Sequence, residues 1–92
     1  YRLSGNDRNG SVSGLDPTVT IALGDTLNFN VDAPGHPFYL KTQSTTGTGN
    51  QVSGATNQGT ENGTVTWTPS ATGTYYYICS LHGGMVGTII VQ

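Results

Sequence analysis

Apolar and polar residues alternate along the chain in short runs with a period of two, which is typical of half-buried β-strands. Leu27, Phe29 and Val31, for example, alternate with Thr26, Asn28 and Asn30. No run shows the 3.6-residue period of an amphipathic helix. The sequence therefore predicts an all-β fold, with strands expected at Tyr1–Ser4, Pro17–Leu23, Thr26–Val31, His36–Thr42, Thr64–Thr68, Thr74–Cys79 and Val86–Val91.

Turn-forming residues separate these runs, at Asn9-Gly10, Ala33-Pro34-Gly35, Asn62-Gly63 and Pro69–Gly73. Ser44–Gly63 is polar and glycine-rich, so we expect a long loop there, with a short strand or turn near Val52. Several short strands with turns between them indicate a β-sandwich. A chain of 92 residues can bury one modest core. We therefore expect residues 1–92 to form a single domain, either a free protein or a module of a longer chain.

The charge and the short apolar stretches exclude nucleic acid as a partner and a segment that crosses a membrane. The formal net charge is −2 and the chain has no basic run, so a nucleic acid partner is not expected. The longest apolar stretches are four to six residues, far too short to cross a membrane. Charge-poor β proteins rich in Thr, Asn and Gly are more usual outside the cytoplasm, which favours a non-cytoplasmic location.

The most informative residues are the single cysteine and its neighbours. Cys79 cannot form an internal disulfide, and His82 and Met85 follow it at three and six positions. A second histidine, His36, lies far upstream. One thiolate, two imidazoles and one thioether form the ligand set of a blue-copper site, which suits a metal that cycles between Cu(I) and Cu(II). The sequence thus predicts one copper ion bound by His36, Cys79, His82 and Met85.

Each of these residues also has a simpler interpretation. Cys79 and Met85 could be core residues, and His36 could be a loop histidine packed between Pro34 and Pro37. Three ligands within seven residues can share a metal only if Cys79–Met85 folds back as a loop, for which Gly83-Gly84 would supply backbone freedom. A trigonal copper plane needs a ligand from a distant segment, and His36 is the remaining histidine.

The segment Gly73–Val91, GTYYYICSLHGGMVGTIIV, resembles the C-terminal half of a cupredoxin of the plastocyanin, pseudoazurin and amicyanin group. Pro17–Thr42 resembles the half that carries the first histidine. The resemblance implies a Greek-key β-sandwich of about seven to eight strands, with a type 1 copper near one end. By position, it implies His36, Cys79, His82 and Met85 as the ligands, and Tyr75 as a structural tyrosine that ties a loop to the sheet.

Two residues depart from the family pattern beside the thiolate. Pro37 follows the first histidine, where most members have an Asn whose N–H donates to the sulfur. Leu81, with a free N–H, stands two residues after Cys79, where plastocyanin and amicyanin have proline. Hydrogen bonds to sulfur tune the reduction potential, so the potential of a relative does not transfer to this chain.

The resemblance implies that the protein is a one-electron carrier and not an enzyme. It also implies a monomer that binds redox protein partners transiently. Its compartment would be periplasmic, thylakoid-lumenal or extracellular. The edge of His82, ringed by Ala33, Pro34, Leu81 and Gly83, is where electrons would enter and leave. An alternative is a cupredoxin-like module of a larger extracellular or virion-surface protein with structural or incidental copper. Copper storage or delivery is a third possibility, and a multicopper oxidase is excluded because the chain has ligands for one copper only.

Overall fold

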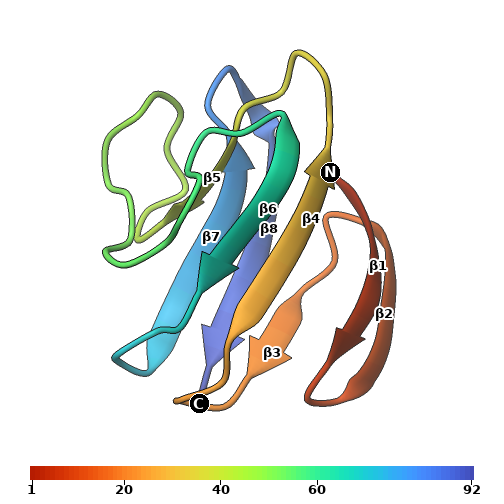
Figure 1. The fold of residues 1–92 in the computed structure, drawn as a ribbon, viewed down its shortest axis with the longest axis vertical. Helices are drawn as coiled ribbons and strands as arrows, with labels where there is room; N and C mark the ends of the chain where they lie inside the picture. Colours follow the sequence, from red (N-terminus) through yellow and green to blue (C-terminus); the bar gives the residue numbers. More distant parts are fainter.

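Eight β-strands and no helix make up the computed structural model, which describes residues 1–92 (Figure 1). The all-β prediction is therefore confirmed. No element is a helix of the length and apolarity needed to cross a membrane. The strands are β1 (Arg2–Asp7), β2 (Gly10–Leu15), β3 (Val19–Ile21), β4 (Leu27–Asp32), β5 (Phe38–Lys41), β6 (Asn62–Trp67), β7 (Gly73–Cys79) and β8 (His82–Val91).

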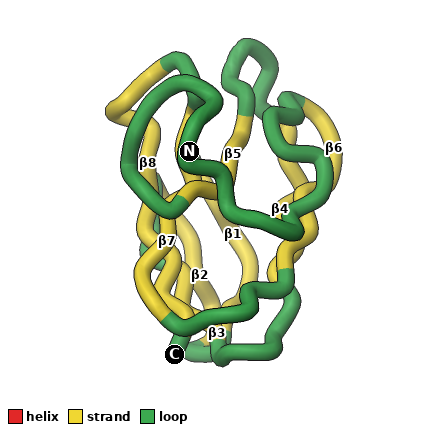
Figure 2. The backbone as a smooth tube through the Cα atoms, turned by 90° about the vertical axis from the view of Figure 1, so that its left-hand side faces the viewer, coloured by secondary structure: helices red, strands yellow, loops and turns green.

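The strands form one four-stranded sheet and two two-stranded sheets. The large sheet has the order β3-β8-β7-β5, in which β3 and β8 are parallel and the other pairs are antiparallel. β4 pairs with β6, and β1 pairs with β2, both antiparallel. Figure 2 shows β7 and β8 on one side of the molecule and β4 and β6 on the other, as in a β-sandwich.

The alternation of side chains explains which face of β4 is buried. Leu27, Phe29 and Val31 are buried, and the residues between them are exposed. On the exposed face, the Thr64 hydroxyl of β6 donates to Asn30 Oδ1 at 2.9 Å. The apolar face therefore packs into the core, while cross-strand hydrogen bonds occupy the polar face.

Aromatic rings dominate the core between the layers. Phe38 lies 5.0 Å from Phe29 and 5.1 Å from Tyr1, between ring centroids. Tyr77 stacks on Phe38 at 6.0 Å, and its hydroxyl donates to the Pro17 carbonyl at 2.5 Å. Such aromatic pairs contribute beyond the area that they bury.

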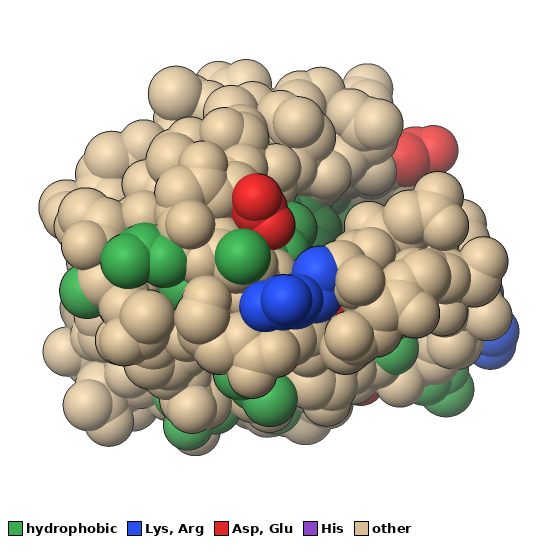
Figure 3. Space-filling view, turned by 90° about the horizontal axis from the view of Figure 1, so that it is seen from below, with side chains coloured by type: hydrophobic (Ala, Val, Ile, Leu, Met, Phe, Trp, Pro, Cys, Tyr) green, Lys and Arg blue, Asp and Glu red, His purple; other side chains and the backbone are tan.

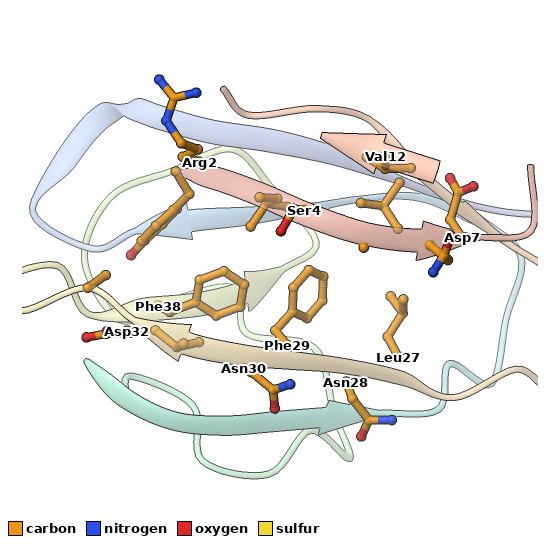
Figure 4. A pocket seen from close by; sticks show the side chains of 17 residues that line it. Arg2, Ser4, Asp7, Val12, Leu27, Asn28, Phe29, Asn30, Asp32 and Phe38 are labelled. Atoms are coloured by element: carbon orange, nitrogen blue, oxygen red, sulfur yellow. The ribbon is translucent and has the colours of Figure 1, made fainter. Parts of the chain in front are cut away.

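A cavity of about 290 Å³ lies between β1 and β4 (Figure 4). Residues 1–7 line one wall and residues 27–33 the other, with Val12 and Val19 among the remaining lining residues. No hydrogen bonds join β1 to β4, because the only partner of β1 is β2 and the only partner of β4 is β6. The interior is therefore less completely filled on this side than beneath the four-stranded sheet.

The N-terminal region contains more strand than the sequence indicated. The expected strand at Tyr1–Ser4 extends from Arg2 to Asp7, and a second strand at Gly10–Leu15 was not expected. The turn at Asn9-Gly10 is confirmed, since it joins these strands into a hairpin in which Asp7 faces Gly10. Residues 10–15 have few apolar side chains, so their strand depends on backbone pairing that leaves little pattern in the sequence.

The predicted turn at Asn62-Gly63 is wrong, because both residues belong to β6 and pair with Asp32 and Val31. The chain turns earlier, where Thr60 N–H donates to the Asn57 carbonyl at 3.1 Å. The long loop before it is confirmed apart from its end, and Val52 is buried within it. The other expected strands are present, although His36–Thr42 is reduced to Phe38–Lys41 and Pro17–Leu23 to Val19–Ile21.

Candidate metal centre

His36 is brought to the centre by the turn that precedes β5. Phe38, the first residue of β5, faces Cys79, the last residue of β7. The His36 N–H donates to the Ala33 carbonyl at 3.0 Å, and the Ser80 N–H donates to the Pro37 carbonyl at 3.1 Å. The histidine segment is therefore attached directly to the segment that follows the cysteine.

Cys79 and His82 face each other across the tight turn Ser80-Leu81 that joins β7 to β8. The next pair in the ladder is Ile78 with Val86, so Gly83–Met85 are three residues in excess of regular pairing. The expected fold-back between Cys79 and Met85 is present, but its turn is shorter than the predicted loop. Gly83 and Gly84 do not have positive φ angles. The fold-back therefore does not use the left-handed conformations that only glycine adopts easily.

The ligand atoms of His36, Cys79 and His82 all lie within 4.8 Å of one another. Cys79 Sγ is 3.7 Å from His36 Nδ1 and 3.4 Å from His82 Nδ1. With metal–sulfur and metal–nitrogen bonds of about 2.3 and 2.0 Å, as for zinc, a trigonal arrangement separates S and N by about 3.7 Å. The three side chains therefore have the spacing of ligands around a single ion.

Burial differs sharply among the three side chains. Cys79 is fully buried, His36 is half-buried and His82 is exposed. Both histidines direct Nδ1 toward the sulfur, which leaves Nε2 on the far edge of each ring. The neighbouring Leu81 is 65 % exposed, so an apolar side chain lies at the surface next to His82.

Met85 lies in the three-residue excess before β8 resumes its pairing. It is half-buried and packs against the hydrophobic core cluster. Met85 thus lies on the same strand as His82, three residues further along, and its side chain contacts the core.

Lys41 organises the loop that lies against the turn, a role that the sequence did not reveal. Its side chain is fully buried, and Nζ donates to the carbonyls of Thr45 and Gly47 at 2.8 and 2.7 Å. Burial lowers the pKa of the Lys41 ammonium. Gly47 N–H in turn donates to the Ser80 carbonyl at 2.8 Å, which connects the lysine to the residue after Cys79. The only sequence feature that could have indicated this role is the position of Lys41 at the end of the apolar strand β5.

Two tyrosines make hydrogen bonds to backbone carbonyls, one at the start of β7 and one in the segment that carries the first histidine. The Tyr75 hydroxyl donates to the Ala71 carbonyl at 2.9 Å, which confirms the predicted structural tie between a loop and the sheet. The Tyr1 hydroxyl donates to the carbonyl of His36 itself at 2.8 Å, and nothing in the sequence predicted this contact.

The centre lies at one end of the sandwich, where β7 ends and β5 begins (Figure 1). Figure 3 shows the opposite end of the molecule, where the visible surface is mostly uncharged and no histidine appears. The two histidines are the only ones in the chain, so the imidazole ligands are gathered at a single end.

The donor set decides which metals fit. A thiolate with two imidazoles suits copper or zinc and does not suit Mg²⁺ or Ca²⁺, which take oxygen ligands. A nearby thioether adds a soft donor that favours Cu(I). The residues present therefore fit copper in both of its oxidation states.

Comparison with known families agrees with this chemistry. A family model described as copper binding proteins, plastocyanin/azurin family, matches residues 6–92. The matched residues include both histidines, the cysteine and the methionine. No curated protein sequence and no solved structure matches the chain.

Proposed function

Because the chain belongs to the plastocyanin/azurin family of copper-binding proteins, we propose that it carries single electrons between partner proteins through one type 1 copper ion. The cofactor is copper. His36, Cys79, His82 and Met85 would hold the ion, and their donors would suit both Cu(I) and Cu(II), so that the protein acts as a carrier and not as an enzyme.

The observation that carries this proposal is the spacing of the sulfur and the two Nδ1 atoms, at 3.7 and 3.4 Å. Electron transfer is fast when the ligands need not move as the copper changes oxidation state. The hydrogen bond from Ser80 to Pro37 and the pairing of Cys79 with His82 hold the ligand segments together without the metal. A preformed centre of this kind favours redox cycling.

The exposed side of His82 is the proposed route for electrons. His82 and Leu81 present an imidazole edge and an apolar side chain at the same surface. Redox partners form small and short-lived interfaces, for which such a limited apolar surface is sufficient. The protein would act as a monomer in the periplasm, thylakoid lumen or extracellular space.

The first test is the visible spectrum after addition of Cu(II) to the metal-free protein. Charge transfer from the Cys79 thiolate should give an intense visible band, and Cys79→Ser should abolish it while circular dichroism still reports a β-fold. A wild-type protein that binds Cu(II) without this band would contradict the type 1 assignment.

Voltammetry then separates an electron carrier from a copper store or a structural site. A carrier should give a reversible one-electron couple, with copper retained in both oxidation states. Loss of copper on reduction would instead favour storage or delivery. Slow and irreversible reduction with copper retained would favour the alternative of a module with structural or incidental copper.

A further inference from the structure

Tyr1 connects the aromatic core to the upstream ligand. Tyr1 is 9 % exposed, and its ring packs edge-on against Phe38 at 5.1 Å between centroids. From this position its hydroxyl donates to the His36 carbonyl at 2.8 Å. Phe38 is also the β5 residue that pairs with Cys79 of β7. The Tyr1 ring therefore packs against a residue that neighbours both His36 and Cys79.

The backbone of Tyr1 is itself fixed. The Asp16 N–H donates to the Tyr1 carbonyl at 2.6 Å, in addition to the pairing of Arg2 with Leu15. A side chain that is held at both its backbone and its ring loses little entropy when its hydroxyl makes one more bond. The Tyr1 hydroxyl is therefore a well-placed donor.

The electrostatic environment of Tyr1 agrees with this position. Burial raises the pKa of the Tyr1 phenol.

Few other donors are available to the upstream ligand segment. Pro37 has no N–H, and the Ser80 N–H is occupied by the Pro37 carbonyl. The carbonyl of His36 receives its one side-chain hydrogen bond from Tyr1. Movement of this carbonyl would displace the His36 ring, because both are attached to the same Cα.

We propose that Tyr1 is a positioning residue of the copper centre: its hydroxyl holds the His36 backbone so that Nδ1 stays at ligand distance from Cys79. The inference rests on the proposed function only in that copper is bound by His36 and Cys79. Residues that orient metal ligands typically contribute 10- to 100-fold in affinity, as a rough guide. Tyr1 would therefore set copper affinity and reduction potential without touching the metal.

Tyr77 supplies a matched control. It belongs to the same aromatic cluster, its phenol pKa is also raised by burial, and its hydroxyl also donates to a backbone carbonyl. That carbonyl belongs to Pro17, which is not in a ligand segment. Tyr1→Phe and Tyr77→Phe each remove one oxygen and one such hydrogen bond, so they should lower the stability of the metal-free protein by similar amounts.

The experiment compares Cu(I) and Cu(II) dissociation constants, the reduction potential and the Cu(II) paramagnetic resonance spectrum of wild type, Tyr1→Phe and Tyr77→Phe. Tyr1→Phe should weaken copper binding about tenfold and change both the potential and the copper hyperfine splitting. Tyr77→Phe should leave all three at wild-type values. In the metal-free protein, the His36 amide, which bonds to Ala33, should exchange faster only in Tyr1→Phe.

Wild-type copper affinity, potential and amide exchange in Tyr1→Phe would overturn the inference and leave Tyr1 as a core residue only. Equal changes in both tyrosine variants would also overturn it, because the effect would then follow from general loss of stability. These outcomes are separate from failure of the proposed function. A wild-type protein without the visible band would disprove the type 1 centre. The affinity and exchange measurements test the role of Tyr1 separately, because they do not depend on electron transfer.

Discussion

The two sides of the core differ in how completely their strands are paired. On one side, β3, β8, β7 and β5 form a continuous four-stranded sheet. On the other side, β1-β2 and β4-β6 are separate pairs, and a cavity of about 290 Å³ lies between β1 and β4 (Figure 4). Cys79 and His82 belong to the continuous sheet, and His36 lies two residues before its edge strand β5.

This difference indicates which side of the core is the more tightly packed. Residues of β7 such as Tyr77, Ile78 and Cys79 have no exposed surface, whereas strand residues of β1 are exposed or half-buried. Close packing restrains atoms on every side, while a cavity leaves the residues that line it without contacts in one direction. The continuous sheet should therefore be sensitive to small changes in side-chain volume, and the cavity side should tolerate them.

Gly87→Ala should have the largest effect. Gly87 faces Tyr77 in the sheet, and a Cβ at Gly87 would lie 2.0 Å from the Tyr77 ring. Relief of this overlap requires movement of a buried ring, so we expect a loss of about 3 kcal/mol in the free energy of unfolding, measured with urea. Gly49→Ala is the control, because nothing lies within 4 Å of its added Cβ, and its effect should stay within about 0.5 kcal/mol. Equal stability of the two variants would show that the sheet is not tightly packed here.

Val91→Ala and Val12→Ala compare the same change on the two sides. Val91 is 2 % exposed in β8, whereas Val12 is half-buried and lines the cavity. Removal of two methyl groups from a filled site should cost about 2 kcal/mol, since the transfer and cavity terms add. At Val12 the expected loss is below about 1 kcal/mol, because few contacts are removed. Losses of equal size in thermal or urea unfolding would mean that the cavity closes in solution.

Tyr77→Phe should have a smaller effect than Gly87→Ala or Val91→Ala at neutral pH, a loss of about 1 kcal/mol from the hydrogen bond to the Pro17 carbonyl. Its dependence on pH is more informative. Burial raises the pKa of Tyr77 in the folded protein, so above a pH of about 10 the unfolded chain loses this proton and the folded chain does not. The stabilisation is thus fully present below the unfolded pKa and is lost as the pH rises above it.

Urea unfolding between pH 8 and about 11 tests this sign, since the range spans the ordinary tyrosine pKa. The wild type should lose stability more steeply than Tyr77→Phe at the alkaline end. Lys41, with its lowered pKa, acts in the opposite direction, but it is present in both proteins and cancels in the difference. Parallel curves would mean that the Tyr77 phenol reaches solvent in the folded state.

The cluster of His36, Cys79 and His82 could be predicted from the sequence because metal chemistry allows few residue types. Cysteine and methionine occur once each, and both histidines were needed to complete the set. The alternation in β4 also predicted a strand, because one face of that strand is buried and the other is exposed. In both cases the side chains themselves carry the information.

The contacts that support the centre were not predictable in this way. The bond from Tyr1 to His36 joins residues 35 positions apart, and it depends on how the β1–β2 hairpin lies against the core. The bonds of Lys41 end on backbone carbonyls, which every residue has. Strand β2 was missed for a related reason, because its stability comes from pairing with β1 and not from a buried side-chain pattern.

The step in the β7–β8 ladder separates the metal end of β8 from the rest of that strand. Beyond Gly83–Met85, regular pairing resumes with Ile78 opposite Val86 and continues to Gly73 opposite Val91. A change in the number of residues within the step would therefore leave every later side chain of β8 on its present face, since β7 and β3 set its register. The length of this segment can thus vary independently of the fold, and with it the position of Met85 relative to Cys79.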